Sequence, residues 1–155
     1  MGMTRPSQRS ENSPSRRRTH VPAASSPAAL QRMRSTRRRD TAAELALRRE
    51  LYRRGLRYRV ELAVLPGLRR RADIVFTRAR VVVFVDGCFW HGCPIHATRP
   101  KANGRFWAEK LSANQARDRD TDLRLAAANW QVARVWEHED VAAAADRIEA
   151  LVGRA

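Results

Sequence analysis

Long apolar runs, cysteine and lysine are all scarce in this chain of 155 residues. No stretch approaches the roughly 20 consecutive apolar residues of a membrane-spanning helix, so we expect no membrane association. The N-terminal residues are polar and lack the apolar segment of a secretory signal peptide. Two cysteines, Cys88 and Cys93, are too few for the disulfide scaffold of a small secreted protein. A reducing compartment and a metal site fit the two thiols better.

Positive charge is abundant, with 31 basic residues against 16 acidic ones and a formal net charge of +15. Only Lys101 and Lys110 are lysines, so arginine carries nearly all of this charge. The planar guanidinium binds phosphate through paired hydrogen bonds and stacks on bases. The excess therefore favours a polyanionic partner, nucleic acid first, whose binding weakens steeply with salt. A coding bias explains the choice of arginine over lysine but not the net excess.

The composition of the chain changes near residue 40. Residues 1–39 are rich in serine, proline and arginine, with arginine runs at 16–18 and 37–39 and no apolar periodicity. We predict a disordered basic tail over residues 1–39 and one folded domain over residues 40–155. The tail either adds sequence-independent DNA affinity or is an upstream extension from a misplaced start codon.

The sequence pattern of residues 40–155 predicts an α/β architecture, in which helices flank a mixed sheet. Thr41-Ala42-Ala43-Glu44 matches the capping box at a helix start, and apolar residues then recur every four positions. The pattern predicts helices over 41–54, 106–128 and 141–152, strands over 58–64, 72–76, 81–85 and 131–136, and a loop over 86–101.

Four potential zinc ligands stand out. Cys88, Cys93 and His96 lie in the predicted loop with the spacing C-x4-C-x2-H, and His138 follows the last predicted strand. Thiolate and imidazole are the ligands that zinc prefers, and four of them make a closed structural site. The alternative is that both cysteines are small buried residues and both histidines are polar surface groups.

Two acidic residues lie at the ends of predicted strands. Asp73 opens one short apolar strand, and Asp86 ends the next. A carboxylate beside buried apolar residues is costly unless it binds a cation or makes strong hydrogen bonds. Two such acids on adjacent strands are suited to Mg²⁺, which prefers oxygen ligands. The alternatives are that Asp73 pairs with Arg70 or Arg71, and that Asp86 caps the turn at Gly87.

His91 and Glu44 are candidates for proton transfer. A neutral His91 near a hydrated cation would act as a general base, and its cation would stabilise a leaving group. Its other possible roles are a fourth zinc ligand or a surface histidine. Glu44 would orient His91 or a water molecule, a role that is compatible with helix capping.

Aromatic residues accompany these groups. Phe89 and Trp90 lie in the predicted loop, and Trp107 follows it. Large apolar rings in a basic loop are suited to insertion between base pairs, which is easier at a mismatch. For Phe89 and Trp90 we favour insertion, whereas for Trp107 insertion and packing are equally plausible. For Trp130 and Trp136 we expect packing on the core.

Together these motifs resemble those of the very-short-patch mismatch-repair (Vsr-type) endonucleases. The matching strings, in chain order, are D-T-A-A-E at 40–44, L-P-G at 65–67 before Asp73, V-D-G-C-F-W-H-G-C-P-I-H at 85–96, F-W-A-E-K at 106–110 with Asn114 and Arg117-Asp118, and Trp130 with V-W-E at 135–137. The likeness covers residues 32–138, and several motifs in one order make it specific.

This resemblance implies a PD-(D/E)xK nuclease of the restriction-enzyme type, with an α/β core and a magnesium site. The implied reaction is hydrolysis of one phosphodiester on the 5′ side of the thymine in a T·G mismatch, which starts repair of deaminated 5-methylcytosine. The implied roles are magnesium ligation by Asp73 and the Val85 carbonyl, catalysis by His91 supported by Glu44, intercalation by Phe89, Trp90 and Trp107, and zinc binding by Cys88, Cys93, His96 and His138.

The chain departs from the family pattern at three places. Ala72 stands where proline usually precedes the catalytic aspartate. Some members carry histidine at the position of Asp86, which leaves its role as base, ligand or neither open. Some carry cysteine at the position of His138, and histidine can replace it as a zinc ligand.

The resemblance also sets the expected surroundings of the protein. We expect a monomer in the bacterial cytoplasm near the nucleoid, acting with mismatch-repair proteins and beside a cytosine methyltransferase system. The competing hypotheses are a related nicking nuclease with another DNA target and a zinc-stabilised DNA-binding module without catalysis.

Overall fold

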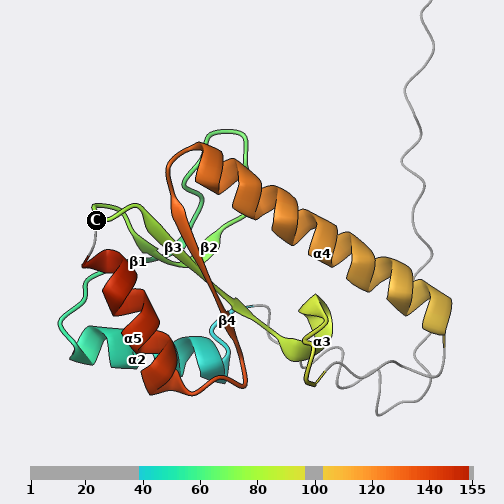
Figure 1. Ribbon diagram of the computed structural model, residues 1–155, viewed down its shortest axis with the longest axis horizontal. Helices are drawn as coiled ribbons and strands as arrows, with labels where there is room; N and C mark the ends of the chain where they lie inside the picture. The colour runs from blue at the N-terminus through green and yellow to red at the C-terminus, as the bar shows by residue number, and fades with distance from the viewer. Residues whose placement is uncertain (1–38, 97–102, 154–155) are drawn as a thin grey trace, which may run out of the picture.

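The computed structural model describes residues 39–96 and 103–153, so the predicted basic tail lies almost entirely outside the described residues. Its elements, in chain order, are α2 (Ala42–Arg53), β1 (Arg59–Leu62), β2 (Ala72–Phe76), β3 (Val81–Asp86), α3 (Cys88–His91), α4 (Gly104–Ala127), β4 (Gln131–Trp136) and α5 (Val141–Val152) (Figure 1). Among the described residues, no helix is both long and apolar enough to cross a membrane.

The strands form one mixed sheet in the order β1-β2-β3-β4. β2 pairs antiparallel with both β1 and β3, whereas β4 lies parallel to β3. A parallel neighbour requires a long crossover, and the chain makes it through α3 and α4. This arrangement confirms the predicted α/β class with a mixed sheet.

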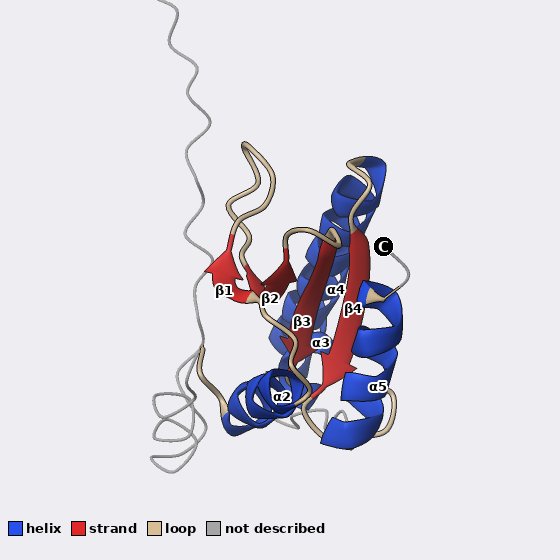
Figure 2. Cartoon of the chain, turned by 90° about the vertical axis from the view of Figure 1, so that its left-hand side faces the viewer, coloured by secondary structure: helices blue, strands red, loops and turns tan. Residues whose placement is uncertain are grey.

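Helices cover both faces of the sheet (Figure 2). On one face, Leu47 and Leu51 of α2 and Ile148 of α5 pack with the inward side chains of β2, β3 and β4. On the other face, Leu125 of α4 packs with Val82 and its neighbours. Burial of these aliphatic side chains is the main favourable contribution to the fold, and it fixes α4 against the face that bears the polar cluster described below.

The start of α2 follows the predicted capping box. The Thr41 side chain accepts a hydrogen bond from the Glu44 amide, and the Glu44 carboxylate accepts one from the Asp40 amide at 2.8 Å. Glu44 is therefore held in a fixed position, with only 4% of its surface exposed.

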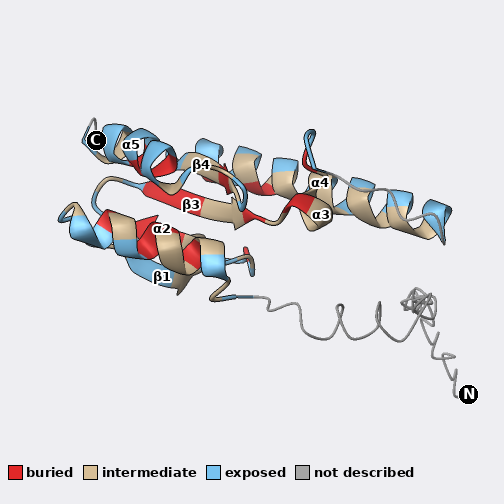
Figure 3. Ribbon diagram, turned by 90° about the horizontal axis from the view of Figure 1, so that it is seen from below, coloured by how far each residue is buried: buried red, intermediate tan, exposed pale blue. Residues whose placement is uncertain are grey.

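The loop predicted over residues 86–101 is wrong in one respect, because it contains the short helix α3. A helix of four residues is too short to show an apolar period, so the sequence pattern gave no sign of it. It ends at Gly92, whose φ of 67° is left-handed, and a Cβ there would lie 2.6 Å from the Gln115 side chain. Glycine thus lets α3 turn sharply beside α4, which extends past the sheet (Figure 3).

Candidate active site

A cavity of about 270 Å³ brings the predicted catalytic residues together. Its lining includes Glu44 from α2, Asp73 from β2, Val85 and Asp86 from β3, and His91 from α3. Antiparallel pairing of β2 and β3 places the first residues of β2 beside the last residues of β3, which explains why both acids reach this cavity.

Asp73 is the most perturbed acid in the cavity. Its Oδ2 accepts a hydrogen bond from the Val85 amide at 2.7 Å. Burial raises the pKa of Asp73, the hydrogen bond from the Val85 amide lowers it, and the nearby charges of Glu44, Glu61 and Asp86 raise it, with a net pKa of about 6. A bound cation stabilises the ionised form of a buried carboxylate among like charges, because it offsets both the loss of hydration and the repulsion between the acids.

Three of these carboxylates form a cluster. Ligand oxygens of Glu44, Glu61 and Asp73 all lie within 4.8 Å of one another. Glu61 reaches the cluster from β1 with a left-handed φ of 52°, a conformation that costs energy in a residue other than glycine. The sequence reading did not single out Glu61. Oxygen donors in this number suit a hard divalent cation such as Mg²⁺.

The alternative partners proposed for Asp73 are engaged elsewhere. Arg70 donates to Asp120 and to Thr121, at 2.8 and 2.5 Å. Arg71 donates to the Glu61 carbonyl at 2.8 Å. The alternative interpretation, in which Asp73 pairs with one of these arginines, is therefore wrong.

His91 is held by an acid from α4. Its Nδ1 lies 2.7 Å from Oδ2 of Asp118 and 3.5 Å from Oδ1 of Asp86. A carboxylate that accepts from Nδ1–H fixes the ring and its tautomer, which leaves Nε2 as the nitrogen for proton transfer. Asp118 lies within the R-D motif of the sequence, yet the sequence reading gave it no role.

Asp86 has a strong partner that the sequence reading also missed. Both of its oxygens accept from Nη1 of Arg134 on β4, at 2.9 and 2.8 Å. Its carboxylate is therefore engaged by a guanidinium, and the expected cap on the turn at Gly87 is not among its contacts in the described part of the chain.

A second cluster contains the four predicted zinc ligands. Ligand atoms of Cys88, Cys93, His96 and His138 lie within 4.8 Å of one another. Nδ1 of His138 is 3.0 Å from Sγ of Cys88 and 3.8 Å from Sγ of Cys93, and Nδ1 of His96 is 3.9 Å from Sγ of Cys93. Ligands about 2.0–2.3 Å from a tetrahedral zinc ion stand roughly 3.3–3.8 Å apart, so the donor set fits that metal. His91 lies outside this cluster.

The thiols of this cluster also favour a cation. Burial and the neighbouring Cys93 raise the pKa of Cys88 to about 11, so without metal it stays a protonated thiol. A zinc ion stabilises the thiolate and displaces that proton.

The predicted intercalating residues form one aromatic group. Phe89 stacks edge-on against Trp90 and Trp107, with ring centroids 5.0 and 5.3 Å apart. Phe106 extends the group, and the ammonium of Lys110 lies 5.4–5.6 Å from three of its rings. All four rings are half-buried, so each keeps surface available for a partner.

The other two tryptophans lie away from this group. Trp130 packs on the core around Leu125, as expected from the sequence. Trp136 is half-buried and stacks on His138, with ring centroids 6.4 Å apart, so it supports the Cys–His cluster.

Comparison with known proteins identifies the family. A family model described as DNA mismatch endonuclease Vsr matches residues 26–96. The type II nicking enzyme V.NaeI of Lentzea aerocolonigenes is 41% identical over 141 residues, which is 87% of this chain and 85% of that protein. The DNA mismatch endonuclease Vsr of Escherichia coli is 42% identical over 106 residues, 68% of this chain and 66% of that protein. This chain belongs to the Vsr family.

Membership in the Vsr family makes the protein an endodeoxyribonuclease with DNA as its partner. The hypothesis of a DNA-binding module without catalysis is therefore wrong. Endonucleases of this kind generally use a divalent metal, and the described residues offer two groups of potential ligands, one of carboxylates and one of thiols and imidazoles.

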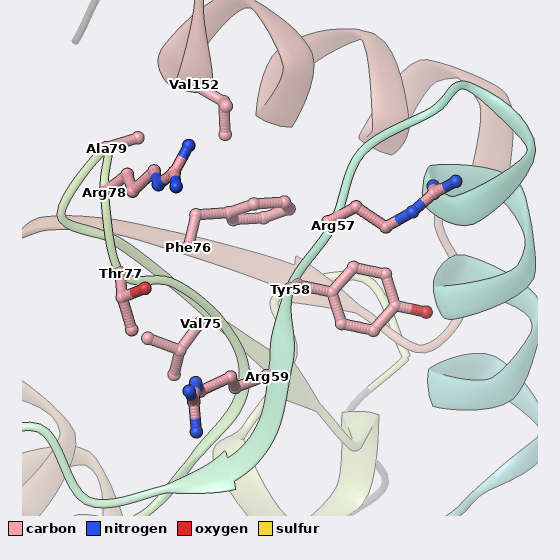
Figure 4. Close-up of a pocket in the computed structure, with 9 residues that line it drawn as sticks. All are labelled: Arg57, Tyr58, Arg59, Val75, Phe76, Thr77, Arg78, Ala79 and Val152. Carbon is pink, nitrogen blue, oxygen red and sulfur yellow. The ribbon is translucent and has the colours of Figure 1, made fainter.

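A larger cavity, of about 610 Å³, lies at the opposite end of the β2–β3 hairpin. Its lining includes Arg57, Arg59 and Arg78 around Tyr58 and Phe76, but no acid, histidine or cysteine (Figure 4). It has no group that binds a divalent cation or transfers a proton at neutral pH. The smaller cavity, which is lined by carboxylates and an imidazole, is therefore the candidate catalytic site.

Proposed function

We propose that this endonuclease nicks duplex DNA on the 5′ side of the thymine in a T·G mismatch, by magnesium-dependent hydrolysis of one phosphodiester. The nicked duplex would be the substrate for the next step of very-short-patch repair. The observation that carries the proposal is one cavity lined by a carboxylate with a raised pKa, Asp73, and by an imidazole, His91, that is oriented by Asp118.

The cation would lie against Asp73, with Glu44 and Glu61 close by and the Val85 carbonyl as a further ligand. Bound Mg²⁺ would neutralise charge on the scissile phosphate and make water a better nucleophile. His91 would accept or donate the proton at Nε2, while Asp118 stabilises its cation through Nδ1. The charge of Arg117 at the rim would attract the phosphate.

The aromatic group Phe89-Trp90-Trp107 would insert at the mismatch. A T·G pair is easier to unstack than a Watson–Crick pair, so insertion converts that difference into selectivity. Phe89 and Trp90 belong to α3, the helix that ends at His91, so correct insertion and correct placement of the imidazole are mechanically linked.

Zinc would be structural. Cys88, Cys93 and His96 belong to the segment that carries His91, and His138 follows β4. A closed four-ligand site would tie this segment to the sheet and leave no open position for substrate.

The test is nicking of end-labelled duplexes that contain T·G, G·C or another mismatch, with Mg²⁺ or with EDTA, and with the cut mapped on each strand. We expect a single cut 5′ to the mismatched thymine, only with Mg²⁺. Asp73→Asn and His91→Ala should each lower the rate by at least 100-fold without loss of DNA binding. Asp146→Asn, which changes an exposed carboxylate on α5, is the matched control. A variant at Asp73 that keeps full activity would contradict the assignment.

A second candidate is a nicking endonuclease with another DNA target. It is favoured by the relatives that are named type II nicking enzymes, such as V.XorIIP of Xanthomonas oryzae pv. oryzae, 42% identical over 111 residues. Equal rates on T·G and G·C duplexes would select this candidate. Since one chain supplies the whole cavity, we propose that the active form is a monomer.

A further inference from the structure

Arg134 of β4 binds the acids that surround the catalytic histidine. Its Nη1 donates to both oxygens of Asp86, at 2.9 and 2.8 Å. Its Nε and Nη2 donate to Asp122 of α4, at 3.0 and 2.9 Å. Its Nη2 also lies 3.7 Å from the Asp118 carboxylate. One guanidinium thus connects β3, β4 and α4 through three carboxylates.

The carboxylates and the guanidinium of this network are buried enough that each charge needs a partner of opposite sign. Asp86 is 4% exposed, and the Arg134 side chain is 24% exposed, with its guanidinium 4.9 Å from the centre of the Phe84 ring. Burial lowers the pKa of Arg134, but Asp122 and Asp86 outweigh it, so the pKa is raised and the charge is permanent. A buried carboxylate that loses such a partner is left uncompensated, which is strongly unfavourable.

Two of the three acids beside Arg134, Asp86 and Asp118, also face His91. Nδ1 of His91 lies 2.7 Å from Asp118 and 3.5 Å from Asp86. At Asp118 the imidazole contacts Oδ2 and the guanidinium lies nearer Oδ1. At Asp86 the guanidinium contacts both oxygens, and the imidazole lies 3.5 Å from Oδ1. Because each of its three nitrogens already contacts an acid, Arg134 has little capacity left for a DNA phosphate.

We propose that Arg134 is a positioning residue, which holds Asp86 and Asp118 so that His91 presents Nε2 to the cavity. Asp86 acts only through this pair, neither as the general base nor as a cation ligand. The inference rests on the proposed catalytic role of His91, and it assigns a role to Asp86, which the sequence left open, and to Arg134, which the sequence analysis did not single out. The same guanidinium that fixes the acids also prevents them from repelling each other.

The test is a double-mutant cycle with Arg134→Met, Asp86→Asn and the double variant. Nicking is measured in single turnovers at saturating enzyme, on the duplex that the wild type cuts fastest, and the Kd for the same duplex is measured by fluorescence anisotropy in EDTA. A misplacement of about 1 Å costs on the order of 100-fold in rate. We expect each single variant to lose at least tenfold in rate with an unchanged Kd.

The double variant and a conservative variant separate the possible roles. The double variant should be faster than Arg134→Met, because no buried charge is left unpaired. Arg134→Lys should recover part of the rate, since it keeps one charge-assisted bond. Arg53→Met, which removes an exposed pair with Glu50, should leave rate and Kd unchanged.

Three results would overturn the proposal. If Asp86 were the base or a cation ligand, the double variant would be no faster than either single variant. If Arg134 bound phosphate, Arg134→Met would raise the Kd and reduce its salt dependence. If Arg134 only stabilised the fold, its variants would lose thermal stability while the downfield Nδ1–H proton resonance of His91 stayed in place in Arg134→Lys. His91→Ala, measured in parallel, tests the proposed role of the imidazole itself.

Discussion

Asp73→Asn should make the metal-free protein more stable at neutral pH, although it removes a carboxylate from the proposed catalytic centre. In the folded protein the pKa of Asp73 rises from 3.8 to about 6. At pH 7.5 the ionised carboxylate therefore lowers the free energy of unfolding. A shift of about two units corresponds to about 3 kcal/mol. The asparagine side chain is nearly isosteric with the carboxylate and still accepts a hydrogen bond from the backbone amide of Val85. The variant therefore removes the destabilising charge and keeps the hydrogen bond.

The stability difference between wild type and Asp73→Asn should depend on pH. Well below the unfolded pKa of 3.8 the carboxyl is protonated in both the folded and the unfolded chain, so it has no effect on stability. Between pH 3.8 and 6 the unfolded chain ionises while the folded chain stays protonated, so the stability of the wild type falls as pH rises. Above the folded pKa the full penalty is present. The stability difference between wild type and Asp73→Asn should therefore be small at pH 4 and greatest above pH 6.

Urea unfolding in EDTA at a series of pH values measures this difference. Added Mg²⁺ should then stabilise the wild type, by about 1.4 kcal/mol at ten times its Kd, and leave Asp73→Asn unchanged. Asp146→Asn serves again as the exposed control. A variant that is less stable than wild type in EDTA at pH 7.5, or a difference that does not vary with pH, would refute the reasoning.

Three further predictions concern zinc, the aromatic group and the charge. The isolated protein should hold one zinc per chain by elemental analysis, and Cys93→Ser should lower both that content and the Tm, by at least about 5 °C. A zinc-free wild type of equal Tm would contradict the site. Trp90→Ala should slow nicking of a mismatched duplex at least tenfold, whereas Trp130→Phe in the core should not; equal effects would argue against insertion. The affinity for DNA should fall about 10³-fold or more between 50 and 200 mM salt, and a flat dependence would exclude phosphate contacts as its main source.

The regular elements were largely readable from the sequence. The strands over 72–76 and 131–136 and the helix over 141–152 have the predicted bounds, because their apolar patterns are long and uninterrupted. The strand predicted over 58–64 is shorter, Arg59–Leu62, because its pairing with β2 ends at Leu62, and Glu61 within it takes a left-handed φ of 52°. Local conformations of this kind depend on tertiary contacts, which a periodicity does not contain.

The candidate site was predicted in part. Residues in a distinctive local string, such as Cys88 and His91, were found because their types and spacing are rare. Arg134 was missed because it is one arginine among many, and its contacts with the acids depend on strand register. The pairing of Phe84 with Arg134 in the parallel β3–β4 ladder puts Arg134 on the same face as Asp86, two residues on. Asp118 and Asp122, four residues apart on one face of α4, complete the network from a third element.

The segment that carries His91 has two anchors, and both involve β4 or the residues directly after it. Asp86 binds Arg134 of β4, and Cys88 and Cys93, on either side of the histidine, lie beside His138. If either anchor limits the movement of the segment while the other is intact, loss of both should slow nicking by more than the product of the two separate losses. Arg134→Lys measured with and without a zinc chelator gives the four rates that are needed. Rates that simply multiply would mean that the two anchors act independently, on different parts of the site.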